Sequence, residues 1–184
     1  MSIQFYNTIN RKKVEFEPIT LGTVKLYTCG PTVYDTAHIG NFRTFLFEDL
    51  LKRFLIFKGY EVYHVMNITD VDDKTIKRAN KEGMTINELT LRYTKEFMND
   101  IKSLKILPAD KYPRATDHIA EMIQMIQTLE ESGYAYETKD HSVYFRLDSY
   151  DSYGQLTKID LTKQRATERI INDEYSKDNP QDFA

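Results

Sequence analysis

Apolar residues recur in recognisable patterns through the first half of the chain, and each pattern predicts an element. Residues 24–28, Val-Lys-Leu-Tyr-Thr, are a short β-like run. Residues 42–58 carry apolar side chains at helical spacing, which predicts a helix that ends at Gly59. Residues 60–67 are β-rich and predict a second strand. The helix carries its apolar side chains at Phe47, Leu50, Leu51, Phe54 and Leu55.

Two more helices are predicted beyond the second strand. Residues 72–81 have the pattern of a short helix that Gly83 closes. Residues 85–88, Thr-Ile-Asn-Glu, form a capping-box pattern that opens a longer helix. The order strand, helix, strand, helix favours an α/β fold with a parallel sheet, whose ligands bind at the carboxyl ends of the strands. One face of the longer helix carries Ile86, Leu89, Tyr93, Phe97, Ile101 and Leu104.

The character of the chain changes at residues 107–113, which are rich in turn-forming residues. We therefore expect residues 1–107 to form one domain and residues 108–184 to belong to a second. Residues 116–132 predict a helix, and residues 134–146 predict an α+β continuation with a hairpin of two short strands. The tail, residues 163–184, is charged and weakly periodic, so we expect it to be loose unless another segment covers it.

Composition sets broad limits on function. The 184 residues are 41% hydrophobic and 29% charged, as expected for a globular chain with a real core. A single cysteine excludes an internal disulfide framework and suits a reducing cytosol. The chain shows no apolar run of membrane-spanning length and no signal peptide, so we expect a cytoplasmic protein without a membrane partner. The net charge of −3 argues against wholesale coating of nucleic acid, although a local basic surface can still touch RNA.

The most informative stretch lies between the first strand and the first helix. Cys29 follows the strand, and His38, Gly40 and Asn41 directly precede the helix. Small and polar residues between a strand and a helix N-terminus are a common phosphate site, because free amides and the helix dipole favour negative charge. An imidazole can donate to a phosphate oxygen, and a glycine lets a ligand approach the backbone closely. A second polar loop, residues 67–73, falls at the end of the second strand.

Three sequence blocks in these loops resemble a known family. His38-Ile39-Gly40-Asn41 resembles the "HIGH" signature of class I aminoacyl-tRNA synthetases. Residues 27–35, Tyr-Thr-Cys-Gly-Pro-Thr-Val-Tyr-Asp, and residues 66–74, Met-Asn-Ile-Thr-Asp-Val-Asp-Asp-Lys, resemble blocks of the cysteine-specific branch. The resemblance implies that residues 1–107 are the first half of a Rossmann-like nucleotide-binding catalytic domain. It also implies that residues 108–184 are an incomplete part of its connective insertion.

The resemblance further implies a reaction and its participants. The enzyme would activate L-cysteine with Mg-ATP to cysteinyl-adenylate and transfer the cysteinyl group to tRNA(Cys). His38 and Asn41 would be catalytic, stabilising the charge that develops as pyrophosphate leaves, and Thr32 and Gly40 would help them to bind ATP. Asn41 stands where the signature's second histidine is usual, and the cysteine branch tolerates this variant. The full-length protein is expected to be a monomer.

The substrate amino acid is expected at the ends of both strands. By resemblance, Cys29 would be one of four zinc ligands, and the zinc would grip the substrate thiol. Gly30, Tyr27, Thr69 and Asp70 would complete the amino-acid site, with a carboxylate near the substrate's ammonium group. The other three zinc ligands of the family have no counterpart in these residues.

Plainer interpretations of these residues remain open. A lone cysteine is usually a small buried hydrophobe, and His38 by itself would be an ordinary loop histidine. Thr69 and Asp70 can cap the helix that follows, a role for which Asp72 competes. Asp72, Asp73 and Lys74 are expected to be solvated residues at the start of that helix. Tyr27 and Tyr34 flank the expected pocket.

Several parts of the family are missing from the sequence. No Lys-Met-Ser-Lys-Ser-like loop, no completing zinc cluster and no tRNA-binding helical bundle occur in it. We therefore expect this chain to be the N-terminal portion of a longer enzyme and to be inactive by itself. Two alternatives stay open: a ligase of the same fold that joins activated cysteine to a pseudo-disaccharide amine, and a non-catalytic fragment that binds a nucleotide or a partner.

Overall fold

The computed structural model describes residues 3–156, 179 and 181–183. The chain divides into two compact units. The site unit is Glu17–Ile119, and the hairpin unit combines Met1–Phe16 with Ala120–Ala184. Among the described residues, no helix has the length and apolar character that crossing a membrane requires.

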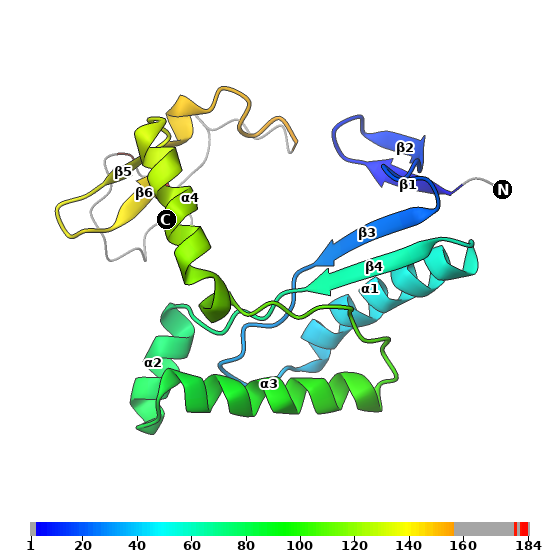
Figure 1. The fold of residues 1–184 in the computed structure, drawn as a ribbon, viewed down its shortest axis with the longest axis horizontal. Coiled ribbons are helices and arrows are strands. Elements are labelled where there is room, and N and C mark those ends of the chain that lie inside the picture. The colour runs from blue at the N-terminus through cyan, green and yellow to red at the C-terminus, as the bar shows by residue number, and fades with distance from the viewer. Residues whose placement is uncertain (1–2, 157–178, 180, 184) are drawn as a thin grey trace. The chain divides into compact units, whose positions relative to one another are not determined.

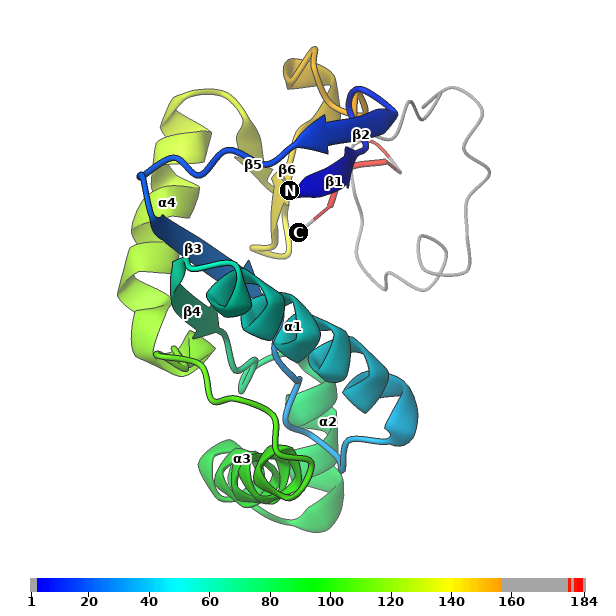
Figure 2. The same cartoon turned by 90° about the vertical axis from the view of Figure 1, so that its right-hand side faces the viewer.

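The site unit is built on two parallel strands (Figure 1). Strand β3 (Thr23–Thr28) pairs with β4 (Glu61–Met66) in a register that places Thr23 opposite Glu61 and Thr28 opposite Met66. Helix α1 (Ile39–Phe57) connects them and packs along both strands (Figures 1 and 2). Helices α2 (Asp73–Glu82) and α3 (Ile86–Ser103) follow β4 and pack against each other. The predicted α/β fold with a parallel sheet is confirmed.

The predicted boundary near residue 107 falls inside the site unit. After α3 the chain runs beside β4 in the same direction, and Met66 donates its N–H to the Lys111 carbonyl at 3.0 Å. Ile68 donates to the Pro113 carbonyl at 2.8 Å. Because these main-chain bonds attach the turn-rich segment to the strand edge, the compact unit extends to Ile119. The division of the whole protein at residue 107 stays a prediction.

The core of the site unit lies where the helices meet the ends of the strands. Its aromatic centre is Phe97 of α3, whose ring centroid lies 5.1 Å from Phe45 and 6.3 Å from Phe42 of α1. The face predicted for α3 is buried as expected over most of its length, although Leu104 at the helix end is exposed. The buried cluster comprises Val33, Phe42, Phe45, Met66, Ile68, Ala79, Leu89, Tyr93, Phe97, Ile101 and Ile106.

Helix α1 differs from the prediction at both its start and its face. It begins at Ile39, three residues before the predicted Phe42, because His38 caps it. The apolar stripe that predicted the helix is largely exposed: Phe47 keeps 67% and Leu50 62% of their surface. Phe42 and Phe45 at the start of α1 are buried against Phe97 of α3. Of the stripe, Leu55 is buried, and the two strands leave its other members at least partly exposed among the described residues.

Helices α2 and α3 begin at the predicted caps. Asp72 caps α2 by accepting the Thr75 N–H at 2.8 Å, and Gly83 ends this helix with a φ of 64°. Thr85 and Glu88 form the predicted capping box of α3. Asp72, rather than Thr69 or Asp70, is therefore the residue that caps α2.

The hairpin unit contains two small antiparallel hairpins and a helix. Strands β5 (Ala135–Glu137) and β6 (Val143–Phe145) form the predicted hairpin, whereas the pair β1 (Gln4–Asn7) and β2 (Lys12–Glu15) was not predicted. Helix α4 (Ile119–Glu131) buries none of its residues and follows a 3₁₀ turn, Ala115–His118. The predicted helix of residues 116–132 therefore starts as a tighter turn.

The end of the chain is held by other segments where it is described, which is the exception allowed in the prediction of a loose tail. Phe183 pairs with Phe145 of β6 by main-chain bonding. Asp182 is buried and accepts the Tyr136 hydroxyl at 2.8 Å and the Leu147 N–H at 2.9 Å. The rest of the predicted tail lies outside the described residues.

The two loops that follow β3 and β4 approach each other most closely at Gly30. Its N–H donates to the Asn67 Oδ1 at 3.0 Å, and a Cβ placed on Gly30 would lie 1.7 Å from the Asn67 carbonyl oxygen. Beyond this contact, Val33 donates to the Thr69 carbonyl and Thr69 to the Pro31 carbonyl, both at 3.0 Å. A glycine is therefore required for the parallel pairing to continue past the strand ends.

We expect Gly30→Ala to destabilise the protein by about 2 kcal/mol or more, because the new Cβ must displace backbone rather than a side chain. Urea unfolding of the full-length protein measures this change. Thr36→Ala, exposed in the same loop, is the matched control and is expected to change stability by less than about 0.5 kcal/mol. Equal stability of Gly30→Ala and the control would contradict the close approach.

Candidate functional site

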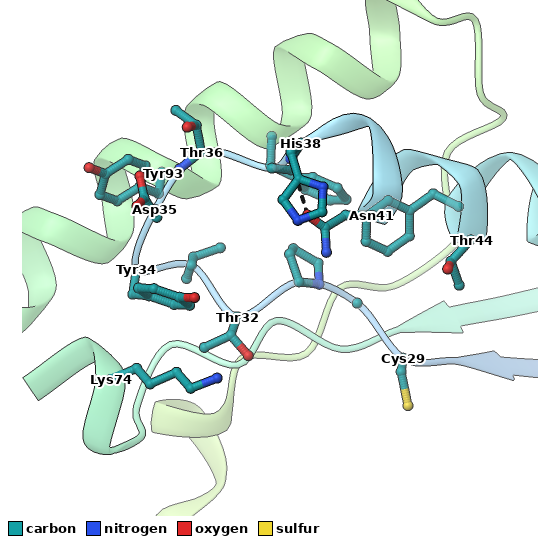
Figure 3. Close-up of a pocket in the computed structure, with 16 residues that line it drawn as sticks. Cys29, Thr32, Tyr34, Asp35, Thr36, His38, Asn41, Thr44, Lys74 and Tyr93 are labelled. Carbon is teal, nitrogen blue, oxygen red and sulfur yellow. Dashed lines mark hydrogen bonds between the residues drawn. The ribbon is translucent and has the colours of Figure 1, made fainter. Parts of the chain in front are cut away.

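A cavity of about 430 Å³ opens beyond the carboxyl end of β3 (Figure 3). Residues 29–37, which form the loop after β3, and the start of α1 line one part of it. Lys74 of α2 and the aromatic side chains of Phe45, Tyr93 and Phe97 line the rest. The volume lies within the range of small-molecule sites, which usually combine apolar walls with a few polar groups. The predicted position of the site, at the end of a parallel strand, agrees with this cavity.

His38 lines the cavity and also caps α1. Its Nδ1 accepts the Gly40 N–H at 3.0 Å, and its own main-chain N–H donates to the Asn41 Oδ1 at 3.1 Å. Because an amide N–H can only donate, Nδ1 is the acceptor in this bond, and Nε2 is the ring nitrogen left to donate. The cap thus assigns His38 one hydrogen-bond donor, Nε2–H, for use beyond the helix.

Gly40 makes room for this cap. A Cβ at Gly40 would lie 2.7 Å from Cε1 and 2.9 Å from Nδ1 of His38. The imidazole therefore lies against the face of the glycine where any side chain would project. Gly40 is not part of the cavity lining, and its structural effect is on the placement of His38.

Cys29 and Thr28 point to opposite sides at the end of β3, as successive strand residues do. The Cys29 thiol is free and exposed, and it lines the cavity. Thr28 is buried, and its Oγ1 lies 2.9 Å from Nε2 of His64, which retains 2% of its surface. Glu48 of α1 also bonds Thr28, so a buried polar chain fixes the strand end behind the thiol.

Burial shifts the ionisation of this polar chain toward the neutral forms. Burial lowers the pKa of His64, and the nearby Lys52 ammonium lowers it further. Burial raises the pKa of Glu48, and the bond to Thr28 offsets part of that rise. Lys52 donates to the Pro108 carbonyl at 2.8 Å, and Asp110 accepts the His64 main-chain N–H at 2.7 Å. No local pattern predicts this network, because its members come from four separate segments of the chain.

Helix α2 supplies the wall of the cavity that sequence analysis missed. Lys74, expected to be merely solvated, lines the cavity and holds its ammonium 5.7 Å from the centre of the Tyr34 ring. Arg78, one turn along, pairs with Asp35 at 3.4 Å and donates to the Tyr93 hydroxyl at 3.3 Å. The helical spacing of the two basic residues after the predicted cap was the available signal.

Asp70 does not line the cavity, and its buried carboxylate accepts three hydrogen bonds from other residues. Its carboxylate is fully buried and accepts the Arg114 Nε–H at 2.8 Å, the Thr116 N–H at 2.9 Å and the Thr116 hydroxyl at 2.6 Å. Burial by itself would raise the pKa of Asp70, but the bonds from Thr116 and Arg114 outweigh it and lower the pKa. These bonds hold the segment after α3 against the loop that follows β4.

The structure therefore brings together part of the predicted site. Cys29, Gly30, Thr32, His38 and Asn41 line one cavity. Tyr27 is 63% exposed on β3 and lies outside the lining, as do Thr69 and Asp70, so their predicted contacts with a substrate stay predictions. Within the described ranges, no cluster of three or more His, Cys, Asp or Glu side chains is arranged to hold a metal.

Comparisons with known proteins match this sequence to one family. Residues 15–184 match the family of "tRNA synthetases class I (C) catalytic domain". The chain is 53% identical over 183 residues to a protein of Chlamydia trachomatis serovar D named "Cysteine--tRNA ligase", covering 100% of this chain and 38% of that protein. A protein of the same name from Thermococcus kodakarensis is 48% identical over 184 residues, with the same two coverages. The chain thus spans 38% of the length of these relatives.

Solved structures show the same fold at low identity. The ternary complex of Agrobacterium radiobacter K84 agnB2 LeuRS-tRNA-LeuAMS matches with a TM-score of 0.56 and 21% identity, covering 65% of this chain and 16% of that chain. A Mycobacterium tuberculosis methionyl-tRNA synthetase in complex with methionyl-adenylate matches with a TM-score of 0.54 and 21% identity. The match covers 61% of this chain and 23% of that chain.

The buried Asp70 network makes the stability of the protein sensitive to acid. Because the folded pKa lies below the unfolded value of about 3.9, ionised Asp70 stabilises the fold above that pH, and this contribution is lost as the pH falls through the folded pKa. We expect Asp70→Asn to cost roughly 3 kcal/mol at pH 7. The cost should shrink as the pH falls below about 4.

Urea unfolding of both proteins between pH 7 and pH 3 measures this dependence. The matched control is Asp117→Asn, an exposed aspartate in the same unit, expected to be nearly neutral at every pH. A constant cost of Asp70→Asn across the range would contradict an ionised, stabilising carboxylate.

Proposed function

Because the chain belongs to the family of class I (C) tRNA synthetase catalytic domains, we propose that the protein activates L-cysteine with Mg-ATP and transfers the cysteinyl group to tRNA(Cys). The observation that carries the proposal is the cavity, which is lined both by Cys29, a residue with a free thiol, and by His38, whose Nδ1 is held by the helix cap. Relatives about half identical over the whole chain and named "Cysteine--tRNA ligase" support it. We place the reaction in the cytoplasm, where translation occurs.

In the first step, a carboxylate oxygen of cysteine attacks the α-phosphorus of ATP. A bond forms between that oxygen and phosphorus, the bond to the bridging oxygen of the β-phosphate breaks, and pyrophosphate leaves with the electron pair. Negative charge on the phosphate oxygens increases on the way, and fixed donors stabilise it. His38 would donate from Nε2, since Nδ1 is occupied by the Gly40 amide.

Asn41 and Thr32 would add to the ATP contacts. The Oδ1 of Asn41 is engaged by the His38 main-chain N–H, which leaves the amide NH₂ as its donor toward a ligand. Asn41 remains neutral at every pH, so it can stabilise developing charge by a hydrogen bond but not by a proton. Thr32 lines the same cavity with a hydroxyl that can donate or accept.

For Gly40, the close contact with His38 supports an indirect role in ATP binding. The imidazole lies against the face of Gly40 where a side chain would project, so the glycine is needed for the donor to reach its position. We therefore propose that Gly40 acts through His38 rather than by direct contact with adenine.

Cys29 would contribute to cysteine recognition as one zinc ligand. The exposed thiol of this lining residue has suitable donor chemistry, but the described residues supply no cluster of three or more metal-binding side chains. A bound zinc would favour the deprotonated thiol of the substrate over the hydroxyl of serine. The described part of the chain does not make a zinc site by itself.

The remaining predicted residues would support the amino-acid site. Gly30 and Thr69 hold the two strand-end loops together, and Tyr27 precedes Cys29 by two residues. Asp70 would act by anchoring the loop that carries Thr69, because its carboxylate oxygens already accept three hydrogen bonds.

Cysteine-dependent ATP–pyrophosphate exchange tests the proposed activation. We expect exchange by the full-length protein and none by residues 1–184. Cys29→Ser should lower kcat/KM for cysteine by about 100-fold or more and reduce bound zinc. Exchange that Cys29→Ser leaves intact would overturn the role of the thiol. Exchange without charging of tRNA(Cys) would point instead to the ligase that acts on an amine.

Gly40→Ala tests whether the helix cap orients His38. The new Cβ must push the imidazole away, so we expect exchange to fall at least about tenfold, approaching the loss in His38→Ala of about 100-fold or more. The double variant should be no worse than His38→Ala, because one change already removes the shared effect.

Ile39→Ala, exposed in the same first turn, is the matched control for Gly40→Ala and should retain nearly full exchange. If the losses from His38→Ala and Gly40→Ala were additive, Gly40 would act on the nucleotide by itself.

A further inference from the structure

Helix α2 presents a stripe of basic side chains that the proposed activation step does not use. Lys77 and Arg78 are neighbours in sequence, and each lies three or four residues from both Lys74 and Lys81. Residues at these spacings share one side of an α-helix. Thr75 and Ala79, on the adjoining side, are buried in the packing of the site unit. The stripe therefore faces away from the core.

The three lysines of this stripe have no carboxylate partner among the described residues. Arg78 forms ion pairs with Asp35 and Glu82. Within the described part of the chain, no ion pair joins Lys74, Lys77 or Lys81 to an acidic side chain. The helix carries four basic and two acidic residues, while the chain as a whole has a net charge of −3. Asp73, Glu82 and the cap Asp72 lie on or beside the same helix, but none of them pairs with Lys74, Lys77 or Lys81 among the described residues. These three ammonium groups are therefore free to bind a partner with several negative charges.

The stripe begins at the cavity. Lys74 belongs to the lining, and Figure 3 shows its ammonium group extending toward Thr32. From Lys74 to Lys81 the helix rises about 10 Å at 1.5 Å per residue. A single strand that ends in the cavity could therefore place consecutive phosphates along the stripe.

We propose that the lysine stripe of α2 binds the phosphates of the single-stranded 3′ end of tRNA as its terminal ribose enters the cavity. This inference rests on the proposed function, since only the transfer step requires an RNA terminus beside the activated amino acid. Lys77 and Lys81 lie outside the cavity lining and contact the strand, whereas Lys74 stands at the junction of strand and cavity. The charges recognise the backbone without reading bases.

The test replaces the two lysines that lie outside the cavity, in the full-length protein. Lys77→Gln/Lys81→Gln should weaken binding of the tRNA transcript and raise its KM in charging by about tenfold. The slope of log Kd against log salt should fall by about 1.4, since each single-strand phosphate contact contributes about 0.7. Cysteine-dependent ATP–pyrophosphate exchange should stay within about twofold of wild type, which also shows that the variant is folded.

The matched control is Lys95→Gln/Lys102→Gln, which removes the same charge from two exposed positions of α3. We expect it to leave the salt slope and the KM for tRNA unchanged. Equal losses in both double variants, or no loss in either, would overturn the proposal for α2. If the wild-type protein shows no exchange at all, the proposed function fails instead, so the two failures are distinguishable.

Discussion

The close approach of two backbone segments at Gly30 and Asn67 is the constraint on which the site depends. It lets the pairing of β3 and β4 continue beyond the strands, so that the loops after them run side by side through Thr32 and Thr69. Without a side chain at Gly30 the loops are separated by one hydrogen-bond length, and the cavity opens beside the first of them. Any larger residue would separate the loops at the point where the lining begins.

A second contact couples the folding of α1 to the chemistry of the cavity. The residue that caps the helix is also the imidazole donor, so forming the first turn fixes which ring nitrogen is left to donate. Most helix caps are short polar side chains that serve only the helix. Here the capping group is a histidine in a cavity, and the glycine two residues later admits its ring. Local helix formation thereby preorganises a donor before any ligand arrives.

The remaining charges divide into those that hold the site and those that face outward. Asp70 with Arg114, and Arg78 with Asp35, join segments that are far apart in sequence and keep the loops of the site unit in place. Lys74, Lys77 and Lys81 make no such pairs within the described part of the chain and stay available to a ligand. The apolar stripe of α1 is likewise left largely exposed by the two strands.

The sequence by itself determined the order and type of the main elements, since periodicity, the caps at Asp72 and Thr85, and Gly83 are local signals read within a few residues. Motif resemblance also identified Cys29, Thr32, His38 and Asn41, which follow one strand and need no long-range contact to be neighbours. Only the tertiary structure decided what lies opposite them. Lys74 completes the cavity from another helix, Asp70 turns inward to Arg114, and the segment after α3 joins the strand edge. Each of these depends on packing between residues distant in sequence, which no local pattern encodes.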